Sequence, residues 1–162
     1  MIWRWWNGDT AKSVAAASPP ASEPDQRETT YAADQKFMTT QPHSIGREQT
    51  MAQAHRMMRE HRFRHLPVLT GGRLVGLLSD RDLNLIETLR DVDPTKVLVE
   101  DAMTSDPYTV SPDAPLDEVV ATMAEHKYGC AVVMQNNKLV GIFTTVDACR
   151  AFAELLHGRL AK

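Results

Sequence analysis

A hydroxyl group and a carboxylate stand three residues apart, directly after a short apolar run, at two places in this chain. The first pair is Ser79 with Asp82, and the second is Thr144 with Asp147. At a helix N-terminus the free N–H groups attract phosphate, and a neighbouring carboxylate can accept both hydroxyls of a ribose. Arg81 could hold phosphate oxygens beside the first pair. The same spacing is also typical of a helix capping box, so a cap and a nucleotide site both remain open.

A histidine followed by a basic residue also occurs twice, as His61-Arg62 and His126-Lys127. Positive groups at the end of a helix are usually a solvated terminus that complements the helix dipole. However, both this pair and the hydroxyl–carboxylate pair recur at the same offset of 65 residues. The recurrence favours two related ligand sites over one catalytic centre.

The whole segment around these residues is duplicated, because residues 38–83 and 103–148 align without a gap. Each copy has apolar periodicity typical of a helix, then two short apolar runs joined by a hairpin-turn sequence, then a second helix. With a short strand before the first helix, the unit is β-α-β-β-α. The predicted fold class is therefore α+β, with two tandem domains packed with pseudo-twofold symmetry. We expect domains at 36–90 and 103–158, a linker at 91–102 and a flexible tail at 1–35.

Composition excludes several classes of function. The net charge of −3 argues against a nucleic-acid binder, and no apolar run is long enough to span a bilayer. The two cysteines are not in metal-binding spacing, and we expect reduced core thiols in a cytoplasmic protein. We find no catalytic set and no phosphate-binding loop. His61 and His65 have i, i+4 spacing, but the chain leaves its helix there, so we expect no metal site.

The strings "MTTQP…HRFRHLPVL…GRLVGLLSDRDL" and "MTSDPYTV…EHKYGCAVV…NKLVGIFTTVDA" cover both repeats. They resemble a tandem pair of cystathionine β-synthase (CBS) domains, called a Bateman module. The resemblance implies a non-enzymatic regulatory module that needs no cofactor and binds AMP, ADP or ATP in the cleft between the domains as an energy-state sensor. NAD or S-adenosylmethionine is the alternative ligand. It also implies a homodimer, with an unidentified protein target as a further partner. A ligand-free dimerisation or protein-interaction module is the competing hypothesis.

The resemblance assigns ribose and phosphate to the hydroxyl–carboxylate pairs, phosphate to the histidine–basic pair, and the base to apolar residues and backbone of the strands. The expected ligand-binding set is Ile45, His61, Arg62, His65, Leu66, Pro67, Ser79, Arg81, Asp82, Val110, His126, Lys127, Cys130, Ala131, Thr144 and Asp147.

The two copies differ in charge at matching positions. In the second copy Gly129 stands where the first has Arg64, and Val146 stands where the first has Arg81. We therefore expect two unequal sites, with tighter anion binding at the pocket of the first copy. Phosphates lying between the copies could draw on residues of both.

Overall fold

The computed structural model of the chain describes residues 37–160, and the expected tail at 1–35 lies outside the described residues. The first copy contains β1 (Thr39–Thr40), β2 (Ile45–Gly46), α1 (Met51–His61), β3 (His65–Thr70), β4 (Arg73–Ser79) and α2 (Asp80–Thr88). A 3-10 turn, η1 (Val99–Asp101), leads to the second copy. That copy contains β5 (Thr109–Val110), α3 (Leu116–His126), β6 (Cys130–Gln135), β7 (Lys138–Thr144) and α4 (Thr145–Leu160).

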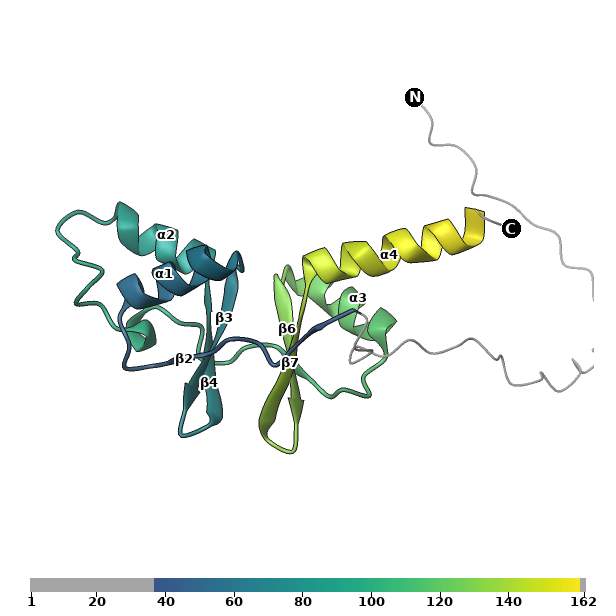
Figure 1. Ribbon diagram of the computed structural model, residues 1–162, viewed down its shortest axis with the longest axis horizontal. Helices are drawn as coiled ribbons and strands as arrows, with labels where there is room; N and C mark the ends of the chain where they lie inside the picture. Colours follow the sequence, from purple (N-terminus) through teal and green to yellow (C-terminus); the bar gives the residue numbers. More distant parts are fainter. Residues whose placement is uncertain (1–36, 161–162) are drawn as a thin grey trace, which may run out of the picture.

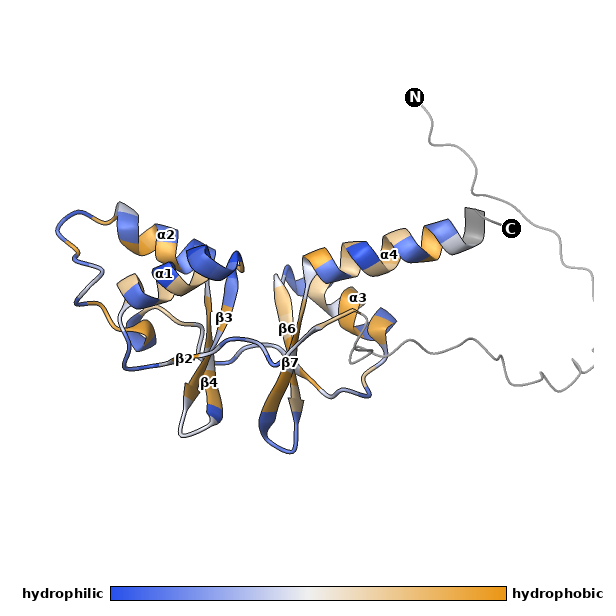
Figure 2. Cartoon of the chain, in the orientation of Figure 1, coloured by the Kyte–Doolittle hydropathy of each residue, from blue (hydrophilic) through white to orange (hydrophobic). Residues whose placement is uncertain are grey.

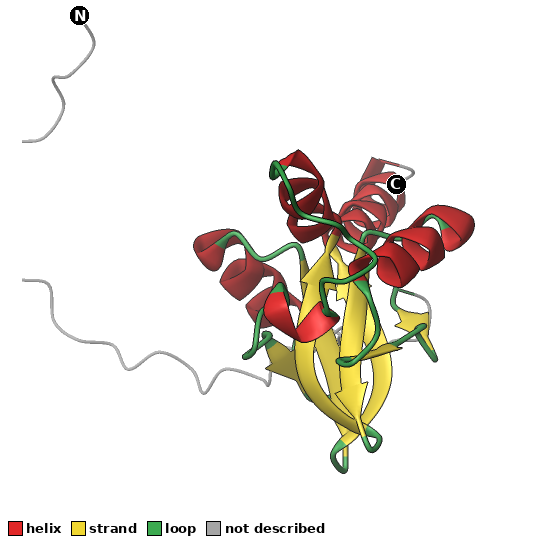
Figure 3. Ribbon diagram, turned by 90° about the vertical axis from the view of Figure 1, so that its left-hand side faces the viewer, coloured by secondary structure: helices red, strands yellow, loops and turns green. Residues whose placement is uncertain are grey.

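The strands form one sheet in each half of the molecule (Figure 1). The first sheet has the order β2-β3-β4 and the second the order β1-β7-β6-β5. The β3–β4 and β6–β7 hairpins are antiparallel, and both registers shift at the same place, between Val68 and Leu69 and between Val133 and Met134. The helices gather at one end of the strands and the two hairpin turns lie at the other (Figures 1 and 3). The predicted α+β fold with two tandem repeats is confirmed.

Local sequence explains where these elements begin and turn. Thr50 and Gln53 form the expected capping box at the start of α1. The first hairpin turns through Gly71 and Gly72, and the second through Asn136 and Asn137, all with positive φ. Positive φ at both central residues gives the twist that a two-residue hairpin requires, and glycine and asparagine tolerate it best.

Strand β1 was not predicted from the sequence patterns, and it leaves its own copy. Thr39 and Thr40 pair with Ile142 and Gly141 of β7, across the pseudo-twofold axis. The start of the second copy does the same in return, because Thr104 exchanges two backbone hydrogen bonds of 2.9 Å with Leu77 of β4. Each repeat therefore completes the sheet of the other.

At each of the two exchanged segments a methionine side chain packs against a glycine of the opposite copy. The Met103 side chain lies where a Cβ of Gly76 would be, and the Met38 side chain lies in the same way against Gly141. The segments that precede each repeat also enter the opposite core, since Phe37 packs with the second copy and Val99 with the first. The strands are the most hydrophobic part of the molecule, and the helices present mixed faces (Figure 2). Within residues 37–160 no helix has the length and apolarity to cross a membrane.

The glycine contacts predict unequal costs for the same substitution. At both glycines the atom closest to an added Cβ is a flexible methionine sulfur, but the Cβ would lie 2.9 Å from the backbone oxygen of Thr104 at Gly76 and 3.3 Å from that of Thr39 at Gly141. We expect Gly76→Ala to lower the free energy of unfolding by about 1–3 kcal/mol, because backbone cannot move aside as a side chain can. Gly141→Ala should cost less. Urea unfolding of both variants measures this, and equal costs would contradict the explanation.

The cysteines predict a simple reactivity difference. Cys130 begins β6 in the interior, and its burial raises the pKa of the thiol to about 12, whereas Cys149 is exposed on α4. Because the thiolate is the reactive form, Cys130 should be inert in the folded protein. Titration with a thiol-specific disulfide reagent at pH 8 should consume one thiol per chain before unfolding and two in denaturant. Rapid reaction of both thiols in the native state would show that β6 opens easily.

Candidate functional site

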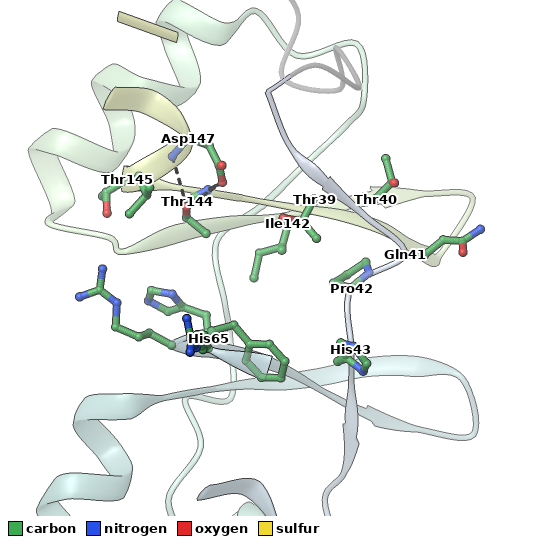
Figure 4. A pocket seen from close by; sticks show the side chains of 14 residues that line it. Thr39, Thr40, Gln41, Pro42, His43, His65, Ile142, Thr144, Thr145 and Asp147 are labelled. Atoms are coloured by element: carbon green, nitrogen blue, oxygen red, sulfur yellow. Dashed lines mark hydrogen bonds between the residues drawn. The ribbon is translucent and has the colours of Figure 1, made fainter. Parts of the chain in front are cut away.

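A pocket of about 460 Å³ lies between the two copies (Figure 4). One wall comes from the first copy, where residues 62–65 join α1 to β3, and the facing wall comes from the end of β7 and the start of α4. The segment from Thr39 to His43, which carries the chain from the second sheet back to the first, closes one side. The pocket exists only because the copies are packed together.

The wall from the second copy is the N-terminus of the 16-residue helix α4. The Thr144 hydroxyl donates to Oδ2 of Asp147 at 2.6 Å, and the Thr144 N–H donates to the same oxygen at 2.9 Å. The Asp147 N–H donates back to the Thr144 hydroxyl at 3.3 Å. Arg150 donates from Nη1 to the other carboxylate oxygen, Oδ1, at 3.0 Å. Asp147 is 6% exposed, so this carboxylate is held in one orientation beside the pocket.

The wall from the first copy is basic. Arg62 ends α1 in the left-handed conformation, with φ of 57°, and Arg64 follows two residues later. Both side chains are exposed and border the pocket. His65 lies across the pocket from Thr144 and Asp147 (Figure 4). Burial and then the positive charge of Arg64 lower the pKa of His65 from its ordinary value of 6.5, although nearby carboxylates oppose this. The wall therefore carries two fixed positive charges and a neutral imidazole at pH 7.

Aromatic rings line the third side of the pocket. His43 and Phe63 both border it, with ring centroids 5.5 Å apart. His61 stacks on His43 at 4.1 Å and is not among the lining residues. In the second copy His126 stacks on Tyr128 at 5.3 Å, and the corresponding pair of the first copy is His61 and Phe63 at 5.8 Å. The two predicted histidines therefore belong to ring stacks at the ends of α1 and α3.

Four of the predicted ligand-binding residues meet in the pocket: Arg62, His65, Thr144 and Asp147. Ser79 and Asp82 instead lie at the start of α2, where they form the same cap: the Ser79 hydroxyl donates to Oδ2 of Asp82 at 2.7 Å. Arg81, Val110, His126 and Lys127 also lie outside this pocket. The cap interpretation therefore holds geometrically at both helices, and at α4 the capping groups also face a cavity.

The apolar residues of the predicted set lie in the strands and contribute little side-chain surface. Ile45, Leu66, Pro67, Cys130 and Ala131 are buried. Any contact that the last four make with a ligand would come from their backbone, which is the role that the sequence resemblance implies for Leu66, Cys130 and Ala131.

Several lining residues were not predicted. Thr39, Thr40, Gln41 and Pro42 belong to the duplicated Met-Thr-x-x-Pro motif, and His43 follows it directly. The repetition of that motif was the available signal, but nothing in it indicated that the segment crosses between the copies. The other lining residues outside the expected ligand-binding set are Phe63, Arg64, Ile142, Thr145 and Val146.

Comparison with known proteins agrees with this architecture. The family model of the CBS domain matches residues 33–85 and 99–154. The CBS domain-containing protein YhcV of Bacillus subtilis is 31% identical over 110 residues, which are 68% of this chain and 78% of YhcV. Inosine-5'-monophosphate dehydrogenase of Korarchaeum cryptofilum is 35% identical over 105 residues, which are 64% of this chain but 21% of that enzyme.

Solved structures show the same fold. The structure of CBSX2 in complex with AMP has a TM-score of 0.69 and 26% identity, and the match covers 77% of this chain and 97% of CBSX2. The CBS domain pair of protein MJ0100, in complex with 5-methylthioadenosine and S-adenosyl-L-methionine, has a TM-score of 0.70 and 24% identity, and the match covers 78% of this chain and 98% of that one. With two repeats that exchange their leading strands around a shared crevice, this chain belongs to the CBS domain family.

Proposed function

We propose that this chain is a non-enzymatic regulatory module that binds an adenine nucleotide in the crevice between its two CBS domains. The observation that carries the proposal is the composition of the pocket. Arg62 and Arg64 come from one copy, and Thr144 and Asp147, at a helix N-terminus, come from the other. The AMP complex of the similar protein CBSX2 supports the choice of ligand class.

Each part of a nucleotide finds matching chemistry in the pocket. Phosphate oxygens would bind the two arginines and lie at the positive end of the α4 dipole, where the Thr145 N–H already bonds the Gly129 carbonyl and the Asp147 N–H bonds the Thr144 hydroxyl. A carboxylate accepts about four hydrogen bonds, and Asp147 already accepts three, so it has room for about one ribose hydroxyl unless Arg150 moves. Pro42, Phe63 and Ile142 offer apolar surface to a base.

Binding would connect the two copies physically, because each supplies one wall. A ligand shifts a conformational equilibrium only by its difference in affinity for the two arrangements. In this pocket that difference would come from the distance between the arginine wall and the start of α4. The module would report on energy state if AMP, ADP and ATP favoured different separations of those walls, and an unidentified protein target would detect the change.

From the pseudo-twofold symmetry we propose a second crevice opposite the first. Its corresponding groups are Ser79, Asp82 and Arg81 from the first copy and Lys127 from the second. Gly129 stands there in place of Arg64, so that crevice has a different arrangement of positive charge. We therefore propose two unequal sites. Both cysteines are free, which fits the reducing cytoplasm that we propose as the compartment.

Matched alanine variants test the site. Asp82→Ala and Asp147→Ala each remove the same helix cap, at a cost of about 1 kcal/mol in stability, so they control for one another. We expect Asp147→Ala to lower AMP or ATP affinity at least about tenfold, because a bond to a charged group contributes about 1.5–3 kcal/mol. Asp82→Ala should lower affinity at the second, weaker site, which gives a separate step in the binding isotherm. Calorimetric titration measures both.

Equal losses in the two variants would contradict unequal sites. Titrations with NAD and S-adenosylmethionine under the same conditions decide the ligand class. If none of the four ligands produced binding heat, the ligand-free dimerisation module would be the better explanation.

Exposed apolar side chains on the second helix of each copy support self-association. Leu85 of α2 is 61% exposed, and Phe152 and Leu155 of α4 are 61% and 58% exposed. Equivalent helices of a pseudo-symmetric module give a surface that suits a second copy of itself, as in twofold dimers. We therefore propose a homodimer formed through these helices.

Light scattering after size exclusion tests the dimer. The wild-type chain should elute with twice the mass of one chain, and Phe152→Glu should shift it to the monomer by placing a charge in an apolar interface. Lys138→Glu, at the start of β7 beside the distant hairpin turn, is the control and should remain dimeric. A monomeric wild-type chain at micromolar concentration would refute the proposal.

A further inference from the structure

We propose that the His65 side chain is a proton-linked phosphate contact, so that an anionic ligand entering the pocket places a proton on this imidazole. The inference rests on the proposed nucleotide function and adds a specificity-determining role for one side chain. It predicts preference for phosphate-bearing ligands over the uncharged nucleoside.

The position of His65 is unusual because its ring reaches across the boundary between the copies. His65 begins β3 and pairs with Ser79 of its own copy. Its ring nevertheless contacts the other copy at Gly129, where a Cβ would lie 2.5 Å from Nε2 and 3.0 Å from Cε1. The ring has this space only because residue 129 is a glycine. It also lines the pocket, opposite the start of α4 (Figure 4).

Charged groups of both signs lie around His65, and they shift its pKa in opposite directions. Arg64 and Arg62 border the same pocket on its own copy, and Asp147 lies on the facing wall. Asp82 and Asp80, behind it at the start of α2, favour the protonated form. Burial and Arg64 outweigh them and lower the pKa, so the imidazole is neutral in the empty pocket at pH 7.

An anion in the pocket reverses this balance. Phosphate oxygens beside Arg64 would offset its positive charge and add negative charge next to the ring, and both changes favour the imidazolium form. Binding would therefore take up a proton from solvent. By linkage, affinity is greatest at low pH and falls as pH rises through the pKa of His65 in the complex, by at most about tenfold per pH unit for one proton.

This device is confined to one of the two crevices. At the pseudo-equivalent position the second copy has Cys130, which is buried and carries no charge at neutral pH, and Gly129 replaces Arg64. The crevice bordered by Ser79 and Asp82 thus has no corresponding imidazole. Its ligand affinity should not show the same proton linkage.

Calorimetry in two buffers of different ionisation enthalpy tests the inference. We expect ATP binding to the wild-type chain at pH 7 to take up a substantial fraction of one proton more than binding to His65→Gln. The difference between the variants cancels protonation of ATP itself. His157→Gln is the control: this exposed histidine lies twelve residues along α4 from its start, about 18 Å away, and should behave as wild type. Adenosine should show no uptake.

A second variant keeps the imidazole but moves it. Gly129→Ala places a methyl group where the ring now lies, so the uptake should fall although His65 is present. If the wild-type chain and His65→Gln bound ATP with equal proton uptake, the role of His65 would be refuted and nucleotide binding would stand. If neither AMP nor ATP bound the wild-type chain, both proposals would fail.

Discussion

The exchange of leading segments between the two repeats is the constraint on which the rest of the structure depends. Met38-Thr39 closes the sheet of the second copy and Met103-Thr104 closes that of the first. The glycines at 76 and 141 leave the space that each methionine side chain fills. After β1 the chain must return to its own copy, and the return path through Thr39–His43 becomes one side of the pocket. The crevice is thus a consequence of how the copies are joined.

Helix capping and ligand binding are compatible at the starts of α2 and α4. A capping hydroxyl and carboxylate satisfy one another and the first N–H groups, which fixes their orientation without using every acceptor site. At Asp147 the bond from Arg150 occupies the second carboxylate oxygen, whereas the bonds from Ser79 to Asp82 all go to Oδ2. The equivalent caps therefore differ in what they leave for a ligand. A ligand would meet this difference at Oδ1, the oxygen that Arg150 bonds in Asp147.

Most of the fold followed from the sequence, because the duplicated segment fixed the order of elements and local signals such as the Thr50 capping box fixed their boundaries. Strand β1 could not be predicted, since Thr39 and Thr40 are exposed polar residues with no apolar signal and their partner lies about a hundred residues away. The same limit applied to the site. Residue types identified Arg62 and Asp147 separately, but only the packing of the copies showed that they face one cavity.

The two repeats agree where they hold one another and differ where they face the crevices. The methionine–glycine contacts occur in both, as do the register shifts in the hairpins and the left-handed residues Arg62 and Lys127. Arg64 and His65 of the first copy correspond to Gly129 and Cys130 of the second. Two of these positions meet across the boundary between the copies, since the small Gly129 makes room for the His65 ring. Different residue types at these positions give the two crevices different charge without altering the scaffold. A duplicated fold can in this way carry two sites of different affinity, because the methionine–glycine contacts that join the copies do not involve Arg64 and His65, which face the pocket.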